Sequence, residues 1–169
     1  MKIIEAMKQI KDLQRKADDL RKLVREHCAI SSVETVKYHN QADKVSGWIQ
    51  AHSDIVKRIL DLRTAIQKTN LATRVTIEID GKGVTKSIAE WIHRRRDLAN
   101  MEKDMWRCLS DRGIVEGKAK GPSGDEMEIK IQRFYSPEKR DKFIDLYSSE
   151  PLLIDSRLEV INAITDLVD

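Results

Sequence analysis

Four histidines and two cysteines are the side chains of this sequence that could bind a metal ion or act as nucleophiles. A protein zinc site needs three or four ligands that converge, commonly with two of them one helical turn apart. No pair of these residues has such a spacing, and the motifs GxSxG, GxxxxGKS/T and GxGxxG are absent. We therefore predict no catalytic residue, no metal and no cofactor, and a protein that is not an enzyme. The six residues are His27, His39, His52, His93, Cys28 and Cys108.

The basic residues raise a second possibility, contact with RNA or DNA. The run HRRR at 93–96 is the densest basic stretch of the chain. On a helix these residues fan around the axis, and we expect Arg96 to pair with Asp97 and Arg94 with Glu90. Nucleic-acid surfaces usually combine a larger basic stripe with aromatic residues, so this function is the alternative to the one favoured below. Its candidate contacts are Arg94, Arg96, Lys118 and Lys120.

Two charged residues fall on the apolar line of a predicted third helix. Continuing the heptad from Ile88 and Trp91 brings Arg95 and Glu102 onto that line. Charges at seam positions are costly unless they are paired. One interpretation is a polar layer that specifies register or oligomeric state. The other is that the helix twists and both side chains extend to solvent.

The elements that position these residues begin with two long helices. Apolar residues recur there at alternating steps of three and four, as in helices that pack along a seam. We predict helices over about 2–30 and 42–70, joined by a short linker into an antiparallel hairpin, with Val24 opposite Trp48 and Leu13 opposite Ile59. The seam residues are Ile3, Ala6, Ile10, Leu13, Ala17, Leu20, Val24 and His27, then Val45, Trp48, His52, Ile55, Ile59, Leu62, Ile66 and Thr69.

The rest of the chain alternates short strands with helices. Residues 74–79 and 126–135 have the period of strands, and we expect the second to pair with the first or with its hairpin partner. Helices are predicted over 87–112, 137–147 and 150–168, with a glycine-rich loop over 113–125. The prediction is a mainly α fold: a long antiparallel helical hairpin in a helix bundle, with a small antiparallel β insert, in a single domain over 1–169.

A polar corner joins the second helix to the first strand, in the stretch QKTNLATRV at 67–75. Thr69 occupies the last seam position of the helix. Asn70 tolerates a left-handed C-cap without glycine, and Thr73 begins the β-prone segment. We therefore predict a structural corner at Thr69, Asn70 and Thr73.

Several segments, in this order, resemble the septicolysin-like family of uncharacterised bacterial and phage-encoded proteins. They are MKIIEAMKQIKDLQRKADDLR, IQKTNLATRV, DGKGVTKSIAEWIHRRRDL and the late RFYS before a final helix. The resemblance covers most of the chain. It implies a mainly helical fold that self-associates, and it implies no established activity.

Composition and charge set the remaining expectations. The net charge is +3, and residues 145–169 carry six acidic side chains against one basic, so this acidic segment could dock on a basic body or both could simply be solvated. We expect free thiols in a reducing compartment, no signal peptide and no membrane span. The favoured function is a non-enzymatic structural or assembly protein that forms a homo-oligomer through its heptads. A phage virion or morphogenesis component, with other virion proteins as partners, is its narrower form, and the expected location is the cytoplasm or the virion.

Overall fold

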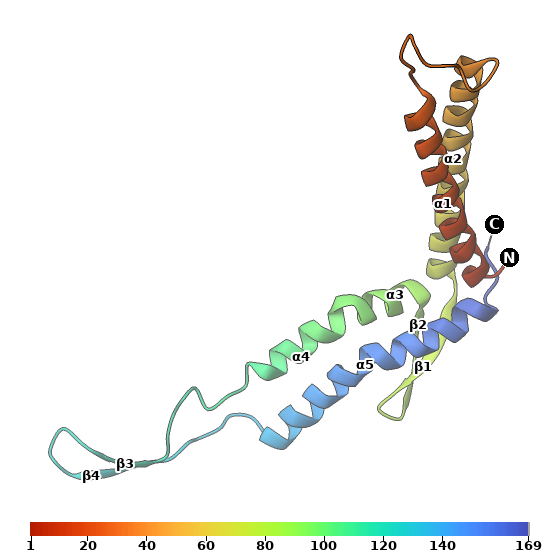
Figure 1. Cartoon of the computed structure of the whole chain (residues 1–169). Coiled ribbons are helices and arrows are strands. Elements are labelled where there is room, and N and C mark those ends of the chain that lie inside the picture. Colours follow the sequence, from red (N-terminus) through yellow and green to blue (C-terminus); the bar gives the residue numbers. More distant parts are fainter. Residues whose placement is uncertain (169) are drawn as a thin grey trace. The chain divides into compact units, whose positions relative to one another are not determined.

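The computed structural model describes residues 1–168 and divides the chain into two compact units. The first unit contains residues 1–74, 87–89 and the chain from Leu158 onward, and the second contains 75–86 and 90–157. The fold is mainly α with a small antiparallel β insert, as the sequence predicted (Figure 1). No helix within residues 1–168 is long and apolar enough to cross a membrane.

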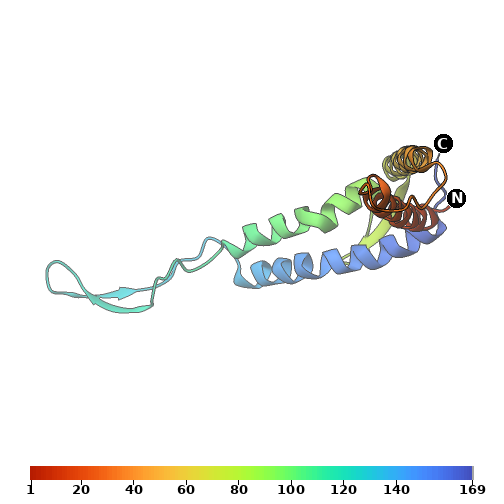
Figure 2. The same ribbon diagram turned by 45° about the horizontal axis from the view of Figure 1, so that its top comes forward.

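The first unit is built on an antiparallel pair of helices, α1 (Ile3–His27) and α2 (Gln41–Ala72). The carboxylate of Glu5 accepts a hydrogen bond of 2.8 Å from the Lys2 amide and so caps α1. Asn40 caps α2 by accepting a hydrogen bond of 3.3 Å from the Asp43 amide. The predicted hairpin is therefore confirmed, and Figure 2 shows its two helices almost end-on.

The two chain termini pair beside the base of this hairpin. The Ile3 amide donates to the Thr165 carbonyl at 3.0 Å, and the Leu167 amide donates to the Met1 carbonyl at 2.8 Å. The ammonium of Lys2 lies 2.6 Å from the Asp166 carboxylate, and this hydrogen bond lowers the pKa of Asp166. The buried side chains of the first unit concentrate at this end: Ile3, Ala6, Leu62, Thr69, Ile88 and Leu158.

The second unit begins with the hairpin of β1 (Arg74–Ile79) and β2 (Lys82–Ser87). Its turn places Asp80 and Gly81 at φ values of 49° and 71°, the left-handed pair that a two-residue type I′ turn requires. The chain then continues through α3 (Ile88–His93), the π-helical turn η1 (Arg94–Leu98) and α4 (Ala99–Arg107). The helix predicted over 87–112 therefore exists, but it contains a π turn and ends five residues early.

Two further predictions about this unit were wrong. The strand at 126–135 pairs with neither β1 nor β2; instead β4 (Glu126–Ile129) pairs with β3 (Gly117–Lys120), inside the predicted loop. A local hairpin closed at Gly121–Asp125 costs less chain entropy than a distant pairing. The two helices predicted over 137–147 and 150–168 are a single helix, α5 (Pro137–Ile164), which contains Pro151. Its buried residues Glu150, Ile154 and Leu158 recur every four positions, so one packed face runs through the proline and keeps the helix continuous.

Helices α4 and α5 lie side by side in both ribbon views (Figures 1 and 2), and an aromatic stack joins them. The rings of Trp106 and Phe143 stack with centroids 4.5 Å apart. Trp91 is buried, and its indole nitrogen donates to the Val75 carbonyl at 3.1 Å. The core of the second unit therefore consists of Ile77, Trp91, Ala99 and Ile154.

Candidate self-association surface

The predicted corner depends on its two threonines. Thr69 is fully buried; its hydroxyl donates to the Ala65 carbonyl at 2.8 Å and accepts from the Val168 amide at 3.0 Å. Thr73 has an extended backbone and ends the helix, and its carbonyl accepts from the Ile88 amide at 3.0 Å. These contacts join three segments of the first unit.

Asn70 does not play the predicted part. It lies inside α2, which continues to Ala72, and it is not among the residues with positive φ. The left-handed cap is unnecessary because the extended conformation of Thr73 leads directly into β1. The buried Oδ1 of Asn70 has no hydrogen-bond partner within residues 1–168.

Arg95 and Glu102 do not form a polar layer with each other. Arg95 pairs with Asp155 of α5, and its side chain is 39% exposed. Glu102 is half exposed and lies 3.7 Å from the guanidinium of Arg94. Both charges therefore lie at the surface of the second unit.

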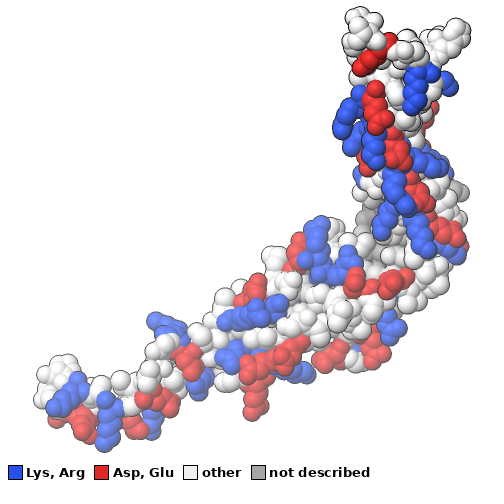
Figure 3. Space-filling view, viewed as in Figure 1, with Lys and Arg blue, Asp and Glu red and all other residues white. Residues whose placement is uncertain are grey.

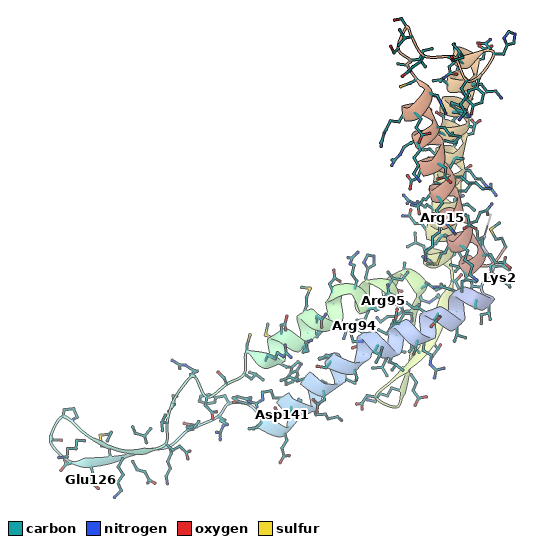
Figure 4. All side chains as sticks on the ribbon, viewed as in Figure 1. Lys2, Arg15, Arg94, Arg95, Glu126 and Asp141 are labelled. Carbon is teal, nitrogen blue, oxygen red and sulfur yellow. The ribbon has the colours of Figure 1, made fainter. Side chains whose placement is uncertain are left out.

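A buried ion pair of the second unit joins Arg94, which is labelled in Figure 4, to Glu150, 56 residues away. Arg94 donates from Nε at 2.6 Å and from Nη2 at 3.0 Å to the two carboxylate oxygens. Glu150 is only 4% exposed, and the guanidinium also lies 5.3 Å from the ring of Tyr147. The hydrogen bond to Glu150 raises the pKa of Arg94, while burial opposes this effect. The sequence indicated Glu90 as the partner of Arg94, because helix spacing reports only neighbours along the chain.

The four candidate nucleic-acid contacts do not form one basic surface. Arg94 is engaged with Glu150, Arg96 pairs with Asp97, and Lys118 lies 3.0 Å from Glu126. Lys120 faces Glu126 across the β3–β4 ladder. On the visible face, positive and negative side chains interleave along the hairpin and along the second unit (Figure 3). These residues therefore give no continuous track for a phosphate backbone.

A cleft of about 580 Å³ lies in the second unit between β2, α3 and α5. Alternate residues of β2, Lys82, Val84 and Lys86, line it, as do the paired side chains of Arg94 and Glu150. Within residues 1–168, His, Cys, Asp and Glu side chains do not gather in a group of three that could hold a metal ion.

The seam of the helical hairpin is largely half-exposed. Only Ala17 and the residues near the base, such as Ala6 and Leu62, are buried, whereas Leu13, Val24 and their seam neighbours are partly open to solvent. At the far end, the ring of His27 lies 5.4 Å from Tyr38 and 5.7 Å from Trp48. The rings of His27, Tyr38 and Trp48 therefore pack together at this end of the hairpin.

A second apolar stripe flanks this seam on α2. Ile49, Val56 and Leu60 are separated by seven and four residues, so they share one face of the helix. Their exposed fractions are 53%, 49% and 63%. A groove of about 280 Å³ borders the stripe, between Arg21 and Val24 of α1 and Ile49 of α2. We call Ile49, Val56 and Leu60 the α2 stripe.

Comparison with known proteins supports the fold and names no function. No family model and no curated protein matches the chain. A crystal structure titled as a functionally unknown conserved protein from Corynebacterium diphtheriae is similar, with a TM-score of 0.57 and 20% sequence identity. The match covers 99% of this chain and 99% of that one. The chain therefore shares its fold, over nearly its whole length, with that protein.

Proposed function

We propose that this protein is a non-enzymatic structural or assembly protein that forms a homo-oligomer through its helical hairpin. The exposed α2 stripe is the observation that carries this proposal. Single exposed apolar residues are normal on protein surfaces, but a row of them beside a half-exposed seam is typical of an interaction surface.

The geometry of two helices explains why a partner is needed. A pair of helices covers its seam from one side only, so the seam residues of an isolated hairpin remain half-exposed. Two hairpins together make a four-helix arrangement that encloses the seam. The seam here is half-exposed along most of its length, which supports an assembly in which further helices cover it.

A second copy of the chain is the partner that we propose. Every copy presents the same stripe, and most soluble homo-oligomers use such self-complementary surfaces around a two-fold axis. If two α2 helices meet in antiparallel fashion about a point near Arg58, Val56 of one copy packs against Leu60 of the other. The same contact then forms twice.

A narrower role rests on the resemblance to the septicolysin-like family and its phage-encoded members. We propose a virion or morphogenesis component as that role, with the cytoplasm or the virion as its location. Mass spectrometry of purified virions tests this part independently of the interface.

Introducing a charge into the α2 stripe tests the proposal. Leu60→Glu places a carboxylate where apolar contact is expected, and it should lower the molar mass measured by light scattering. Lys57→Glu introduces a carboxylate on the same helix outside the stripe and should leave the mass unchanged. Circular dichroism checks that both variants keep their helices, as expected from the exposure of both positions. If Leu60→Glu has the same molar mass as the unmodified protein, the α2 stripe is not part of the interface.

A further inference from the structure

The β3–β4 ribbon is an uncovered element of the second unit. It extends beyond the ends of α4 and α5 in both ribbon views (Figures 1 and 2). All eight residues of its two strands are exposed. An isolated two-stranded ribbon is marginally stable in water, and three or more strands with an apolar face are usually required. The ribbon is therefore a candidate for pairing outside its own chain.

The two faces of the ribbon differ sharply. Opposite residues point to the same face of an antiparallel ladder. One face carries the pairs Gly117 with Ile129 and Ala119 with Met127, and the other carries two lysines opposite two glutamates. The ribbon thus has one apolar face and one charged face. The charged pairs are Lys118 with Glu128 and Lys120 with Glu126.

The backbone direction shows which groups of β4 remain available. The amide of Ile131 donates to the Glu116 carboxylate at 3.1 Å, on the β3 side of the ribbon. Amides alternate in direction along a strand, so those of Glu128 and Lys130 point away from β3. Within residues 1–168, this outer edge of β4 has no neighbouring strand.

We propose that β4 pairs with β4 of a second copy, antiparallel, about a two-fold axis at Ile129. Glu128 of each copy then lies opposite Lys130 of the other, and Met127 lies opposite Ile131. Ile129 meets its own counterpart. Charged residues face opposite charges and apolar residues face apolar residues, so the strand is complementary to itself in this register.

The other edge of the ribbon is unsuitable for the same contact. An antiparallel pairing of β3 about Ala119 would place Lys118 opposite Lys120 twice. Like charges directly opposite each other destabilise a ladder, and lysines are the common means of blocking an edge strand. The pairing of two β4 strands therefore gives a four-stranded sheet with β3 at each outer edge.

This inference deepens the proposed homo-oligomer and rests on it. The α2 stripe and β4 are separate surfaces, and each would form its own two-fold contact. A chain with two such contacts builds assemblies larger than a dimer. Removing either surface alone should leave a dimer held by the other.

Disulfide trapping tests the register. We would first replace Cys28 and Cys108, which are exposed thiols, by serine. In that background Ile129→Cys should form a disulfide-linked dimer under mild oxidation, because residues at a non-hydrogen-bonded antiparallel position have Cα atoms about 4.5 Å apart. Met127→Cys is the control: its counterpart would lie about 13 Å away along the strand, so it should remain unlinked. Equal linking of both variants, or linking of neither, would overturn the pairing.

Mass measurements separate this inference from the proposed function. Glu128→Pro removes an outward amide of β4 and is tolerated at an edge, so it should reduce the assembly to a dimer. Lys118→Pro is the control: it changes the residue opposite Glu128 on β3, outside the proposed contact, and should keep the larger mass. Leu60→Glu should also leave a dimer, and the double variant should be a monomer. If only Glu128→Pro has no effect, the β4 contact is wrong and the helical interface stands. If only Leu60→Glu has no effect, the helical interface is wrong and the β4 contact stands.

Discussion

At the scale of single residues, the second unit depends on one buried ion pair. Arg94 and Glu150 meet through two hydrogen bonds, and Glu150 is almost inaccessible to solvent. A buried pair is a modest source of net stability, but removing one partner leaves the other charge uncompensated. The pair therefore makes the packing of α5 on the π turn sensitive to either residue.

Arg94→Met should lower the free energy of unfolding by about 3 kcal/mol, because it leaves the Glu150 carboxylate buried without a partner. Arg96→Met removes an exposed pair with Asp97 and should cost less than about 1 kcal/mol. Urea unfolding followed by circular dichroism compares the two. If both variants lose similar amounts of unfolding free energy, the buried pair contributes no more to stability than the exposed one.

The corner residues give a second test at this scale. Thr69→Val keeps the shape of the side chain but leaves the Val168 amide without its acceptor, so stability should fall by about 1–3 kcal/mol. Asn70→Ala removes a buried oxygen that has no partner among residues 1–168 and replaces asparagine by a better helix former. It should be neutral or slightly stabilising in the same unfolding experiment. If Asn70→Ala lowers stability more than Thr69→Val does, Asn70 is the residue that stabilises the corner.

At the scale of elements, repeating patterns were predictable and pairings between distant segments were not. The heptads of α1 and α2 determine one face of each helix, and the short linker leaves an antiparallel hairpin as the compact arrangement. By contrast, β3 has the sequence GKAK, which lacks the β-branched and aromatic residues of a strand. Its pairing with β4 comes from the turn at Gly121–Asp125, where the Gly121 amide donates to the Asp125 carbonyl at 2.8 Å.

The candidate surfaces could be predicted from the sequence only in part. The seam was visible in the sequence, but the α2 stripe was not, because only the structure shows which apolar residues remain exposed. The pairing of Arg94 with Glu150 was missed because no local pattern links residues that far apart. The π turn at Arg94–Leu98 also has no signature in the sequence.

A clasp at the base of the ribbon connects the two legs that lead to β3 and β4. Arg133 donates two hydrogen bonds of 2.7 Å to the Asp111 carboxylate, and the Tyr135 hydroxyl donates a third at 3.2 Å. The hydrogen bond from Arg133, with the charge of the guanidinium, lowers the pKa of Asp111 below its ordinary value of 3.8. The clasp is therefore a pH-sensitive feature of this element.

The sign of the pH effect follows from that lowered pKa. A carboxyl group whose pKa is lower in the folded state stabilises the fold above its unfolded value and loses that contribution as the pH falls through the folded value. Stability from the clasp should thus be complete above about pH 5 and decline below about pH 4. Asp111→Asn lacks this titration, so its stability should change less between pH 5 and pH 3 in urea unfolding. If stability falls equally with pH in Asp111→Asn and in the unmodified protein, the clasp does not contribute to the pH dependence.

At the scale of the whole molecule, we propose that the chain associates with itself. Both units leave apolar surface that a second copy would cover, the α2 stripe in the first and the ribbon in the second. The exposed apolar residues of α2 and the uncovered ribbon follow from different parts of the sequence. Both surfaces support the proposed assembly.

The molar mass of the unmodified protein tests this claim most directly. Light scattering at micromolar concentration should give a whole-number multiple of 19.5 kDa, and the two proposed interfaces together predict a value above that of a dimer. A mass of 19.5 kDa would mean that the protein is a monomer, and it would contradict the proposed function and both interfaces at once.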